Sequence, residues 1–425
     1  MSVPLDRLYH FLAGLCNRDD IIIYRYFPHG SKNILDCWPI DPDHTLDQAR
    51  RARSMHMVCH DQEPLSATTA SFLHKQSEFD HKGMTYVPNP DIATTSFKKN
   101  LDAMISVYDH MILVHSERQS AAVERLATTG LLPVYYWSHA LIAQDWYRYA
   151  QHDPELAFVH RSFDRDFLVY NRAWSGTREY RLKFAELIVQ YQLLAHCSMR
   201  FNPEDNGLRY DRHRFANSDF GITLDLSQYF DVNTADASAS ADYDAGDYSQ
   251  AGTEVVLETL FDDTRHHLTE KTLRPLACGK PFLLAASAGS LSYLHSYGFE
   301  TFDPWIDESY DLIQDPVQRL HAIAQEMKRL ATLSPANKSR LWRECHVIAQ
   351  ANKQRFFSDD FLTQVTGEFR SNFDQAMQHA QRSRSGWFFR QWLQAQASAP
   401  DWAKELGTSL NLASVPSQES GGGAS

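Results

Sequence analysis

The chain lacks the features that would place it at once in a secreted, disulfide-bonded or membrane class. Its six cysteines are scattered and none forms a C-x-x-C pair, which argues against a disulfide scaffold and a thiolate zinc site. No apolar run comes near the roughly 20 residues that a membrane-spanning helix requires. The N-terminus also lacks a charged-then-apolar signal pattern. We therefore expect a cytoplasmic protein of a reducing compartment, without membrane insertion.

Several catalytic signatures are absent as well. The sequence contains no P-loop, no G-x-G-x-x-G, no G-x-S-x-G and no catalytic Cys-His signature, so NTPase, dehydrogenase and hydrolase functions are not favoured. The histidines do not form a metal-binding pattern, because His266 and His267 are adjacent and no H-E-x-x-H segment occurs. We expect no bound metal and no other required cofactor.

Positive charge is scarce. The chain carries 41 Lys and Arg against 53 Asp and Glu, a net charge of −12, and its sequence pI is near 5.9. A protein whose main task is to grip nucleic-acid phosphates is usually basic over its binding face, so the overall balance argues against that task. It leaves open a local basic groove built from Arg50, Arg51, Arg53, Lys98 and Lys99.

What is present is the composition of a globular protein, with 43% hydrophobic and 22% charged residues in 425 positions. That length predicts two domains or one large one. In the first 160 residues, β-type runs alternate with amphipathic stretches, a pattern typical of a parallel sheet with helices on both faces. The expected strands are 20–27, 55–60, 110–115 and 133–137, and the expected helices are 5–15, 46–54, 96–106, 118–130 and 141–151.

A second series of the same kind begins near residue 164. Its expected strands are 166–172, 196–202, 254–259 and 280–286, and its expected helices are 178–194, 269–278, 316–333 and 336–354. The segment 152–164 between the two series is the predicted hinge. We therefore predict a Rossmann-like domain at 1–160, a second one at 161–355, helices at 356–408 that pack back on the first domain, and a flexible tail at 409–425.

Two further segments have open interpretations. Residues 219–254 contain eight acidic residues and no Lys or Arg, which predicts a long mobile loop, either a solvated insertion or a lid. The segment 382–394 is aromatic and basic. It either contacts nucleic acid, a membrane surface or a partner, or packs back across the first domain.

The strongest candidate for a binding site is the segment 254–284. In open parallel sheets, ligands bind beyond the carboxyl ends of the strands, where helix N-termini offer unpaired N–H groups to phosphate. Here a strand is followed by a polar loop and by a helix start at Thr269, a good N-cap. Lys271 in the first turn opposes the helix dipole, which is unfavourable unless an anion binds nearby. The segment is therefore either a phosphate site or an exposed helix start.

This segment and two others resemble a known family. T-E-K-T-x-x-P-x-x-x-G-x-P-F at 269–282, H-D-Q-E-P-L at 60–65 and Y-Y-W-S-H at 135–139 look like motifs of GT-B glycosyltransferases. The resemblance is to phage-encoded members and, more distantly, to the fucosyltransferase-like group, and it covers most of the chain before residue 355. It implies two Rossmann-like domains whose parallel sheets face each other across a cleft that binds a nucleotide-sugar. The chain has Glu258-Thr259 where the fucosyltransferases have a longer acidic-Asn-Ser segment, so the identity of the nucleotide-sugar does not carry over.

By this resemblance, the helix start in the second domain holds the nucleotide-sugar. Glu270 would bind ribose or sugar hydroxyls, and Glu258 would be a further sugar or ribose contact. Lys271 and the backbone near Thr269 would bind the diphosphate. The implied co-substrate is a UDP-sugar or, as a second choice, a GDP-sugar. Such enzymes generally neutralise the leaving diphosphate with Arg, Lys and helix dipoles instead of Mg²⁺.

The resemblance also implies a diphosphate contact from the first strand of the second domain. Asn171 and Arg172 at its end would face the diphosphate, and Arg178 at the start of the next helix is a further candidate. Arginine suits this role because its guanidinium is planar and permanently charged. The alternative is that Arg172 and Arg178 form surface ion pairs.

In the first domain, ionisable residues follow the strand 55–60. Transfer of a sugar with inversion requires a general base, and Asp61 and Glu63 are the natural candidates, with His60 third. Along a strand, residues 61 and 63 point one way and residue 60 the other, so only one set would face the cleft. The alternative is that the carboxylates cap the segment that follows.

Polar and aromatic residues follow another predicted strand end. Tyr136, Trp137 and His139 would stack on an acceptor and hydrogen-bond to it, or would pack between helices. Ser116 is expected as the N-cap of the helix 118–130.

These patterns together predict a glycosyltransferase that moves a sugar from a nucleotide-sugar to a hydroxyl acceptor. The phage-like resemblance favours a hydroxymethylated pyrimidine in bacteriophage DNA as that acceptor, in which case the protein works in the host cytoplasm. The alternatives are a transferase that acts on a saccharide or small molecule, and a non-catalytic GT-B-like protein that binds a nucleotide or DNA. The sequence sets neither the oligomeric state nor the stereochemistry of transfer.

Overall fold

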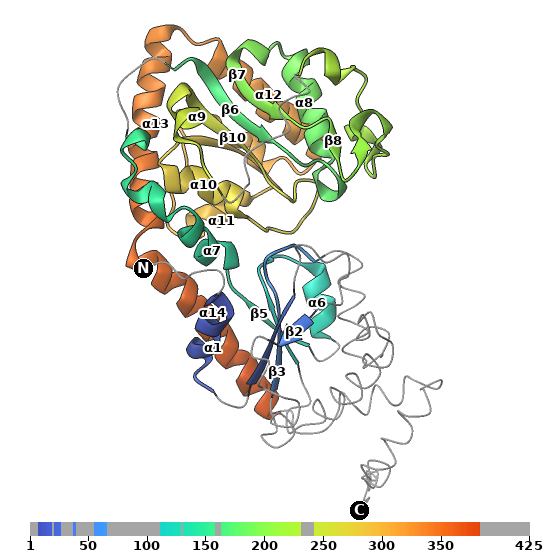
Figure 1. Cartoon of the computed structure of the whole chain (residues 1–425), viewed down its shortest axis with the longest axis vertical. Helices are drawn as coiled ribbons and strands as arrows, with labels where there is room; N and C mark the ends of the chain where they lie inside the picture. Colours follow the sequence, from blue (N-terminus) through green and yellow to red (C-terminus); the bar gives the residue numbers. More distant parts are fainter. Residues whose placement is uncertain are drawn as a thin grey trace, which may run out of the picture.

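The computed structural model describes residues 7–18, 21–26, 37–39, 55–65, 111–128, 131–157, 163–230 and 242–382. Within them lies a mixed α/β fold with two separate, mainly parallel sheets and helices packed around them (Figure 1). This confirms the α/β class with parallel sheets that the sequence pattern predicts. We call residues 7–157 the first part and residues 163–356 the second part.

The first sheet contains β1 (Ile21–Tyr26), β2 (Cys37–Pro39), β3 (Met55–His60), β4 (Met111–His115) and β5 (Leu131–Tyr135). Their order is β2-β1-β3-β4-β5, with β2 antiparallel to β1 and the other neighbours parallel. Met57, Ile112 and Val134 on three of these strands are fully buried. Such apolar strand interiors are typical of a parallel sheet that is covered on both faces.

The second sheet contains β6 (Arg165–Asn171), β7 (Cys197–Phe201), β10 (Ala251–Leu257) and β11 (Phe282–Ala285), in the order β11-β10-β6-β7. All of these neighbours are parallel. The chain runs from β6 to β7 on one side and later returns to place β10 on the other side of β6. The gap between β6 and β10 is therefore the topological switch point of the sheet, where ligands bind in open α/β folds.

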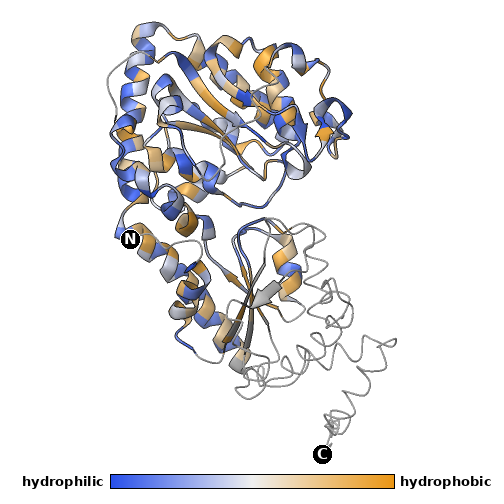
Figure 2. Cartoon of the chain, in the orientation of Figure 1, coloured by the Kyte–Doolittle hydropathy of each residue, from blue (hydrophilic) through white to orange (hydrophobic). Residues whose placement is uncertain are grey.

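Helices with an apolar face pack against the sheets and against one another, and Figure 2 shows hydrophobic and hydrophilic residues alternating along them. The two long helices of the second part begin at standard caps: Asp315 Oδ1 accepts from the Gln318 amide (2.8 Å) and Ser334 Oγ from the Asn337 amide (3.3 Å). The described helices are α1 (Leu8–Cys16), α6 (Ala121–Ala127), α7 (Ser138–Trp146), α8 (Tyr180–Gln190), α9 (Ala245–Gln250), α10 (Glu270–Cys278), α11 (Ser290–Ser296), α12 (Pro316–Ala331), α13 (Pro335–Phe356) and α14 (Asp359–Arg382).

Helix α14 leaves the second part and runs along the first (Figure 1). Its Asn372 Nδ2 donates to the carbonyl oxygen of Tyr135 at the end of β5 (2.8 Å). Its Phe369 ring packs edge-on against the ring of Tyr136, with centroids 5.4 Å apart. This helix therefore joins the two parts by direct contacts with the end of the first sheet.

The acidic segment 219–254 differs from the predicted mobile loop in its described residues, 219–230 and 242–254. Phe220, Leu226 and Tyr248 are buried there, and α9 and the start of β10 lie within it. The sequence did not reveal this order because single apolar anchors in a polar segment produce no helix or strand period.

Several predicted features lie outside the described residues. They are the helices 46–54 and 96–106, the segment 383–394, the tail 409–425, and the basic residues Arg50, Arg51, Arg53, Lys98 and Lys99. Within the part of the chain that the structure describes, no helix is both long enough and apolar enough to cross a membrane.

Candidate functional site

A cavity of about 340 Å³ opens where the carboxyl ends of strands from both sheets meet. Its volume falls within the range of roughly 300–1,000 Å³ that is usual for small-molecule sites. The first part contributes residues that follow β3 and residues of α7, and the second part contributes the segments after β6, β7 and β10 and the first turns of α8 and α10. The lining residues are Gln62, Glu63, His139, Ile142, Trp146, Tyr170, Arg172, Ala173, Arg178, Arg181, Asn202, Glu204, Asp205, Asn206, Thr259, Thr269, Glu270, Lys271 and Arg274.

The cavity lies at the topological switch point of the second sheet. Arg172 directly follows β6, and Thr259 comes two residues after the end of β10, on either side of the gap between these strands. The first turns of α8 and α10 point into the same space. The positive ends of their dipoles favour an anion there.

Two cations of the cavity have no carboxylate partner among the described residues. Arg172 is exposed and makes no hydrogen bond or ion pair with any residue that the structure describes. Arg181 is only 2% exposed, and its guanidinium donates to the carbonyl oxygens of Ala173 (2.6 Å), Glu258 (3.1 Å) and Leu257. Burial lowers the pKa of Arg181, and its Nε atom has no hydrogen-bond partner in the described part of the chain. A buried guanidinium without a carboxylate partner leaves a positive charge that a bound anion would neutralise.

The predicted helix start is built as a capped N-terminus. Thr269 is the N-cap, and its hydroxyl oxygen accepts from the Lys271 amide (3.4 Å). Lys271 Nζ donates to Glu270 Oε1 (2.6 Å) and to Thr269 Oγ1 (3.2 Å). Thr269, Glu270 and Lys271 all line the cavity, so the side chain that opposes the helix dipole lies where an anion would bind.

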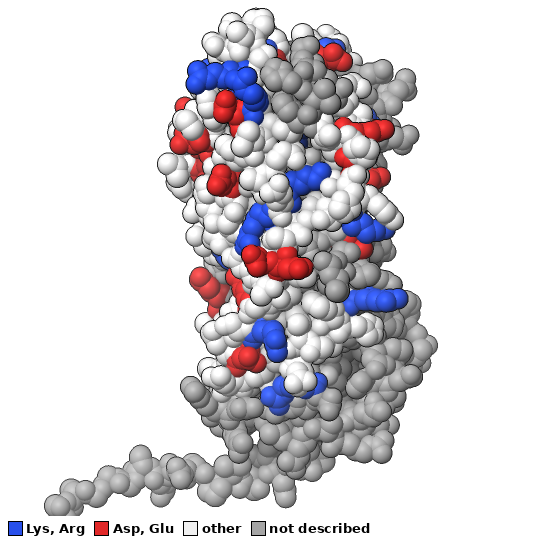
Figure 3. Space-filling model, turned by 90° about the vertical axis from the view of Figure 1, so that its left-hand side faces the viewer, with Lys and Arg blue, Asp and Glu red and all other residues white. Residues whose placement is uncertain are grey.

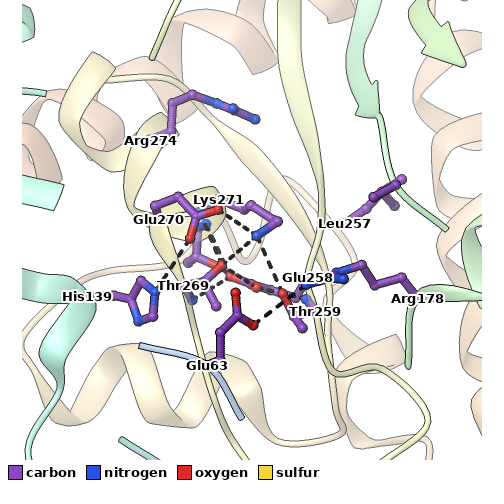
Figure 4. Close-up of polar contacts among 12 residues, drawn as sticks. Glu63, His139, Arg178, Leu257, Glu258, Thr259, Thr269, Glu270, Lys271 and Arg274 are labelled. Carbon is purple, nitrogen blue, oxygen red and sulfur yellow. Dashed lines mark hydrogen bonds and ion pairs between the residues drawn. The ribbon is translucent and has the colours of Figure 1, made fainter. Parts of the chain in front are cut away.

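Glu270 lies between Lys271 and His139 on the cavity wall (Figure 4). Its Oε2 is 3.6 Å from His139 Nε2, and its Oε1 is 2.6 Å from Lys271 Nζ. Burial raises the pKa of Glu270, but the attraction of Lys271 and His139 outweighs it and holds the pKa well below its ordinary value. Glu270 is therefore an anionic hydrogen-bond acceptor for a ligand.

Glu258, predicted as a sugar contact, does not line the cavity. It is fully buried, and its carboxylate accepts from the Thr269 amide (2.8 Å), the Thr269 hydroxyl (2.8 Å) and the Thr272 hydroxyl (2.6 Å). It also accepts from the Thr259 amide (3.0 Å). Glu258 thus ties the end of β10 to the start of α10 and positions the residues that do face the cavity.

Replacing Glu258 by alanine is expected to lower the free energy of unfolding by about 2–4 kcal/mol, because it leaves several buried donors unsatisfied. Urea denaturation monitored by circular dichroism measures this change. Glu258→Gln keeps the shape of the side chain and should lose less. An alanine variant as stable as the wild type would contradict the bracing role.

Asn171 is also buried outside the cavity, whereas Arg178 lines it. Asn171 Nδ2 donates to the carbonyl oxygen of Arg181 (3.0 Å), which fixes the first turn of α8 against the end of β6. Arg178 lies at the start of that helix, 3.7 Å from Glu63 Oε2. This ion pair spans the cavity between the two parts, and Figure 4 shows the two side chains pointing toward each other.

The three candidate bases lie in different environments. Glu63 lines the cavity and is about one-third exposed. Asp61 is buried and accepts hydrogen bonds from the hydroxyls of Tyr9 (2.8 Å) and Tyr136. His60 is buried too, and burial lowers its pKa to about 4. The expected alternation fails because β3 ends at residue 60, so residues 61 and 63 do not share one face of a strand.

Burial raises the pKa of Asp61, although the two tyrosine hydroxyls lower it in part. A carboxyl group with a raised pKa costs the folded state stability as the pH rises from the ordinary value of 3.8 through the raised value. Asp61→Asn removes this dependence. Its free energy of unfolding relative to wild type should therefore increase with pH across that window, by about 1.4 kcal/mol for each pH unit. Urea denaturation between pH 3 and pH 8 measures the difference, with the exposed Asp219→Asn as control; a flat difference for Asp61→Asn would contradict the assignment.

Of the three predicted acceptor contacts, only His139 lines the cavity. Tyr136 and Trp137 are fully buried. Tyr136 donates to Asp61, and Trp137 Nε1 donates to the carbonyl oxygen of Leu268 (2.8 Å) at the junction of the two parts. Tyr136 and Trp137 therefore pack between elements, which was the second interpretation of the sequence. They hold the segment that carries His139 in place.

Two arginines of the cavity were not predicted from the sequence. Arg181 and Arg274 lie in helices, both are nearly completely buried, and Arg274 pairs with the buried Glu254 (2.6 Å). A signal existed for Arg181, because it precedes Leu182 in the apolar part of the expected helix and occupies a position where charge is costly. Without a known sheet order, that signal does not say which side of the helix faces a ligand.

A small hairpin, also not predicted, forms one wall of the cavity. It consists of β8 (Glu204–Asp205) and β9 (Leu208–Arg209), joined by Asn206 and Gly207, which both have positive φ. Asp205 Oδ2 accepts from the amides of Trp174 (2.9 Å) and Ser175 (2.7 Å). The hairpin is thereby tied to the loop between Arg172 and Arg178.

The described residues contain no cluster of three His, Cys, Asp or Glu side chains that is arranged to hold a metal ion. Comparison with known proteins found no match: no protein-family model, no curated protein and no solved structure matches the chain. The function therefore has to be inferred from the geometry of the cavity and from the motifs in the sequence.

Proposed function

We propose that the chain is a GT-B glycosyltransferase that transfers a sugar from a nucleotide-sugar to a hydroxyl acceptor. The observation that carries this proposal is a cavity at the switch point of the second sheet, lined by five cationic side chains and faced by Glu63 of the first part. Arg274 pairs with the buried Glu254, and the other four cations are Arg172, Arg178, Arg181 and Lys271. The motifs at 60–65, 135–139 and 269–282 support the same conclusion.

The cations suit the diphosphate of a nucleotide-sugar. Three of the four are arginines, whose planar, permanently charged guanidinium groups form paired hydrogen bonds to phosphate. Nucleoside and sugar then extend from the diphosphate to opposite sides, and the sugar lies toward Glu63 and His139, where an acceptor reaches it from the first part.

The same cations stabilise the leaving group of the reaction. As the acceptor oxygen forms a bond to the anomeric carbon, the bond between that carbon and the diphosphate oxygen breaks, and its electron pair stays on the nucleoside diphosphate. Negative charge develops on that oxygen in the transition state. Positive groups fixed in advance around it are the type of arrangement that lowers such a barrier most.

Glu63 is the general base of this proposal for an inverting transfer. It is the candidate carboxylate that lines the cavity, whereas Asp61 is enclosed by two tyrosine hydroxyls. The acceptor hydroxyl donates its proton to the Glu63 carboxylate while its oxygen attacks the anomeric carbon. Asp61 then acts as a structural residue that fixes the segment on which Glu63 lies.

A hydroxymethylated pyrimidine in phage DNA stays the leading prediction for the acceptor. The basic residues expected for a DNA groove lie outside the described residues. On the face in Figure 3, Lys and Arg are interspersed with Asp and Glu over the described surface, without a broad field of one sign. If DNA is the acceptor, its affinity should fall steeply with salt.

The proposal is tested by release of nucleoside diphosphate from UDP- and GDP-sugars, measured with and without acceptors. The acceptor panel contains 5-hydroxymethylcytosine DNA, unmodified DNA and a set of oligosaccharides. We expect release that depends on one acceptor class, with the sugar recovered on that acceptor by mass spectrometry. Nucleotide binding without transfer to any acceptor would instead indicate a non-catalytic binding protein.

A further inference from the structure

We infer that the sugar on the nucleotide is uncharged, and that the cavity discriminates against uronic acids and other acidic sugars. This inference rests on the proposed function, because it names the class of sugar that the same cavity accepts. It follows from the pairing of charges along the cavity wall.

The positive charge on the cations that lack a carboxylate partner equals the negative charge of the diphosphate, with none left over for a charged sugar. Among the described residues that line the cavity, Arg172 makes no ion pair, and Arg181 donates to carbonyl oxygens and makes no ion pair. Together they supply two positive charges. The diphosphate of a nucleotide-sugar is esterified at both ends and carries two negative charges at neutral pH, so these two arginines balance it.

Each of the other cations already has a carboxylate. Arg178 is 3.7 Å from Glu63 Oε2, and Lys271 Nζ is 2.6 Å from Glu270 Oε1. Arg274 has its partner outside the cavity lining, at 2.6 Å. None of these three is left to balance an additional negative charge.

The carboxylates of two of these ion pairs lie beside the space that the diphosphate occupies. Glu63 pairs with Arg178, and Glu270 pairs with Lys271 (Figure 4). A sugar bonded to the diphosphate therefore lies near two carboxylates. Carboxylates accept hydrogen bonds from sugar hydroxyls. A sugar carboxylate in the same place would meet like charges without a counterion, and such contacts disfavour the charged ligand.

Matched pairs of nucleotide-sugars test this inference by isothermal titration calorimetry on the full chain. UDP-glucose is compared with UDP-glucuronic acid, and GDP-mannose with GDP-mannuronic acid, since each pair differs only in the oxidation state of one carbon. UDP and GDP alone serve as references. In the nucleotide series that binds, we expect the neutral sugar to bind at least tenfold more tightly than the acidic one.

Glu63→Gln and Glu270→Gln should each narrow this difference, because each removes one negative charge from the sugar end, whereas the exposed Glu124→Gln should leave it unchanged. Equal or tighter binding of the acidic sugar would overturn the inference while the proposed nucleotide site stands. If neither UDP, GDP nor any of the four nucleotide-sugars binds, the proposed function fails, and the inference fails with it.

Discussion

Replacing Glu63 by glutamine is expected to lower the rate of sugar transfer by about 10²–10⁴-fold, the usual contribution of a general base. Glutamine keeps the shape of the side chain but cannot accept the proton of the acceptor hydroxyl. Nucleotide affinity should stay near that of the wild type, because the phosphate contacts belong to other residues. Initial rates with saturating nucleotide-sugar, together with calorimetric nucleotide binding, separate these two effects.

The control for this variant is Glu124→Gln, a like substitution on exposed α6 in the same part of the chain. It should transfer at the wild-type rate. If Glu63→Gln transferred as fast as wild type, Glu63 would not be the base, and His139 would be the remaining residue of the first part, among those described in the cavity lining, that can accept a proton. Asp61→Asn should fold, and any loss of rate in it would come from the position of the segment 61–65.

Replacing Arg172 by alanine is expected to weaken nucleotide binding by about 10- to 150-fold. This range corresponds to the roughly 1.5–3 kcal/mol that a hydrogen bond to a charged group contributes. Arg172 is exposed and makes no ion pair within the described residues, so the free energy of unfolding should not change. Calorimetric titration with the nucleoside diphosphate gives the dissociation constant, and urea denaturation gives the stability.

Arg212→Ala is the matched control, because Arg212 is an exposed arginine of the second part that does not line the cavity. Its removal should leave nucleotide affinity unchanged and therefore tests whether overall charge explains the effect of Arg172. If Arg172→Ala bound the nucleotide as tightly as wild type, the assignment of the diphosphate to the switch point would be wrong. Equal weakening in both variants would point to long-range electrostatics instead of direct contact.

The sheets were the most predictable feature of the fold. Buried runs such as 111–115 and 282–285 are short, apolar and bounded by polar residues or proline, so each was assigned from sequence to within a few residues. The hairpin at 204–209 and helix α9 were missed, since neither is long enough to show a period. The position of β2 beside β1 was not predicted either, because it depends on tertiary pairing.

The cavity residues at the start of α10 were easier to predict than those that follow β3. Lys271 and Thr269 were identified because a lysine behind an N-cap is locally unfavourable, and this argument needs no tertiary structure. Asp61 and Glu63 could not be separated from sequence, since the answer depends on where β3 ends and on the hydroxyl of Tyr9, 52 residues away. The structural role of Glu258 likewise depends on the hydroxyls of Thr269 and Thr272, which the fold brings next to its carboxylate.

The most direct test of the account is a thermal-shift titration of wild type and Arg172→Ala with UDP, GDP and their sugars. For the wild type, one nucleotide series should raise the apparent stability, by about 2.7 kcal/mol when the ligand is present at a hundredfold excess over its dissociation constant. The same concentration should produce a clearly smaller shift in Arg172→Ala. No shift of the wild type with any nucleotide would contradict the central claim that this cavity binds the diphosphate of a nucleotide-sugar.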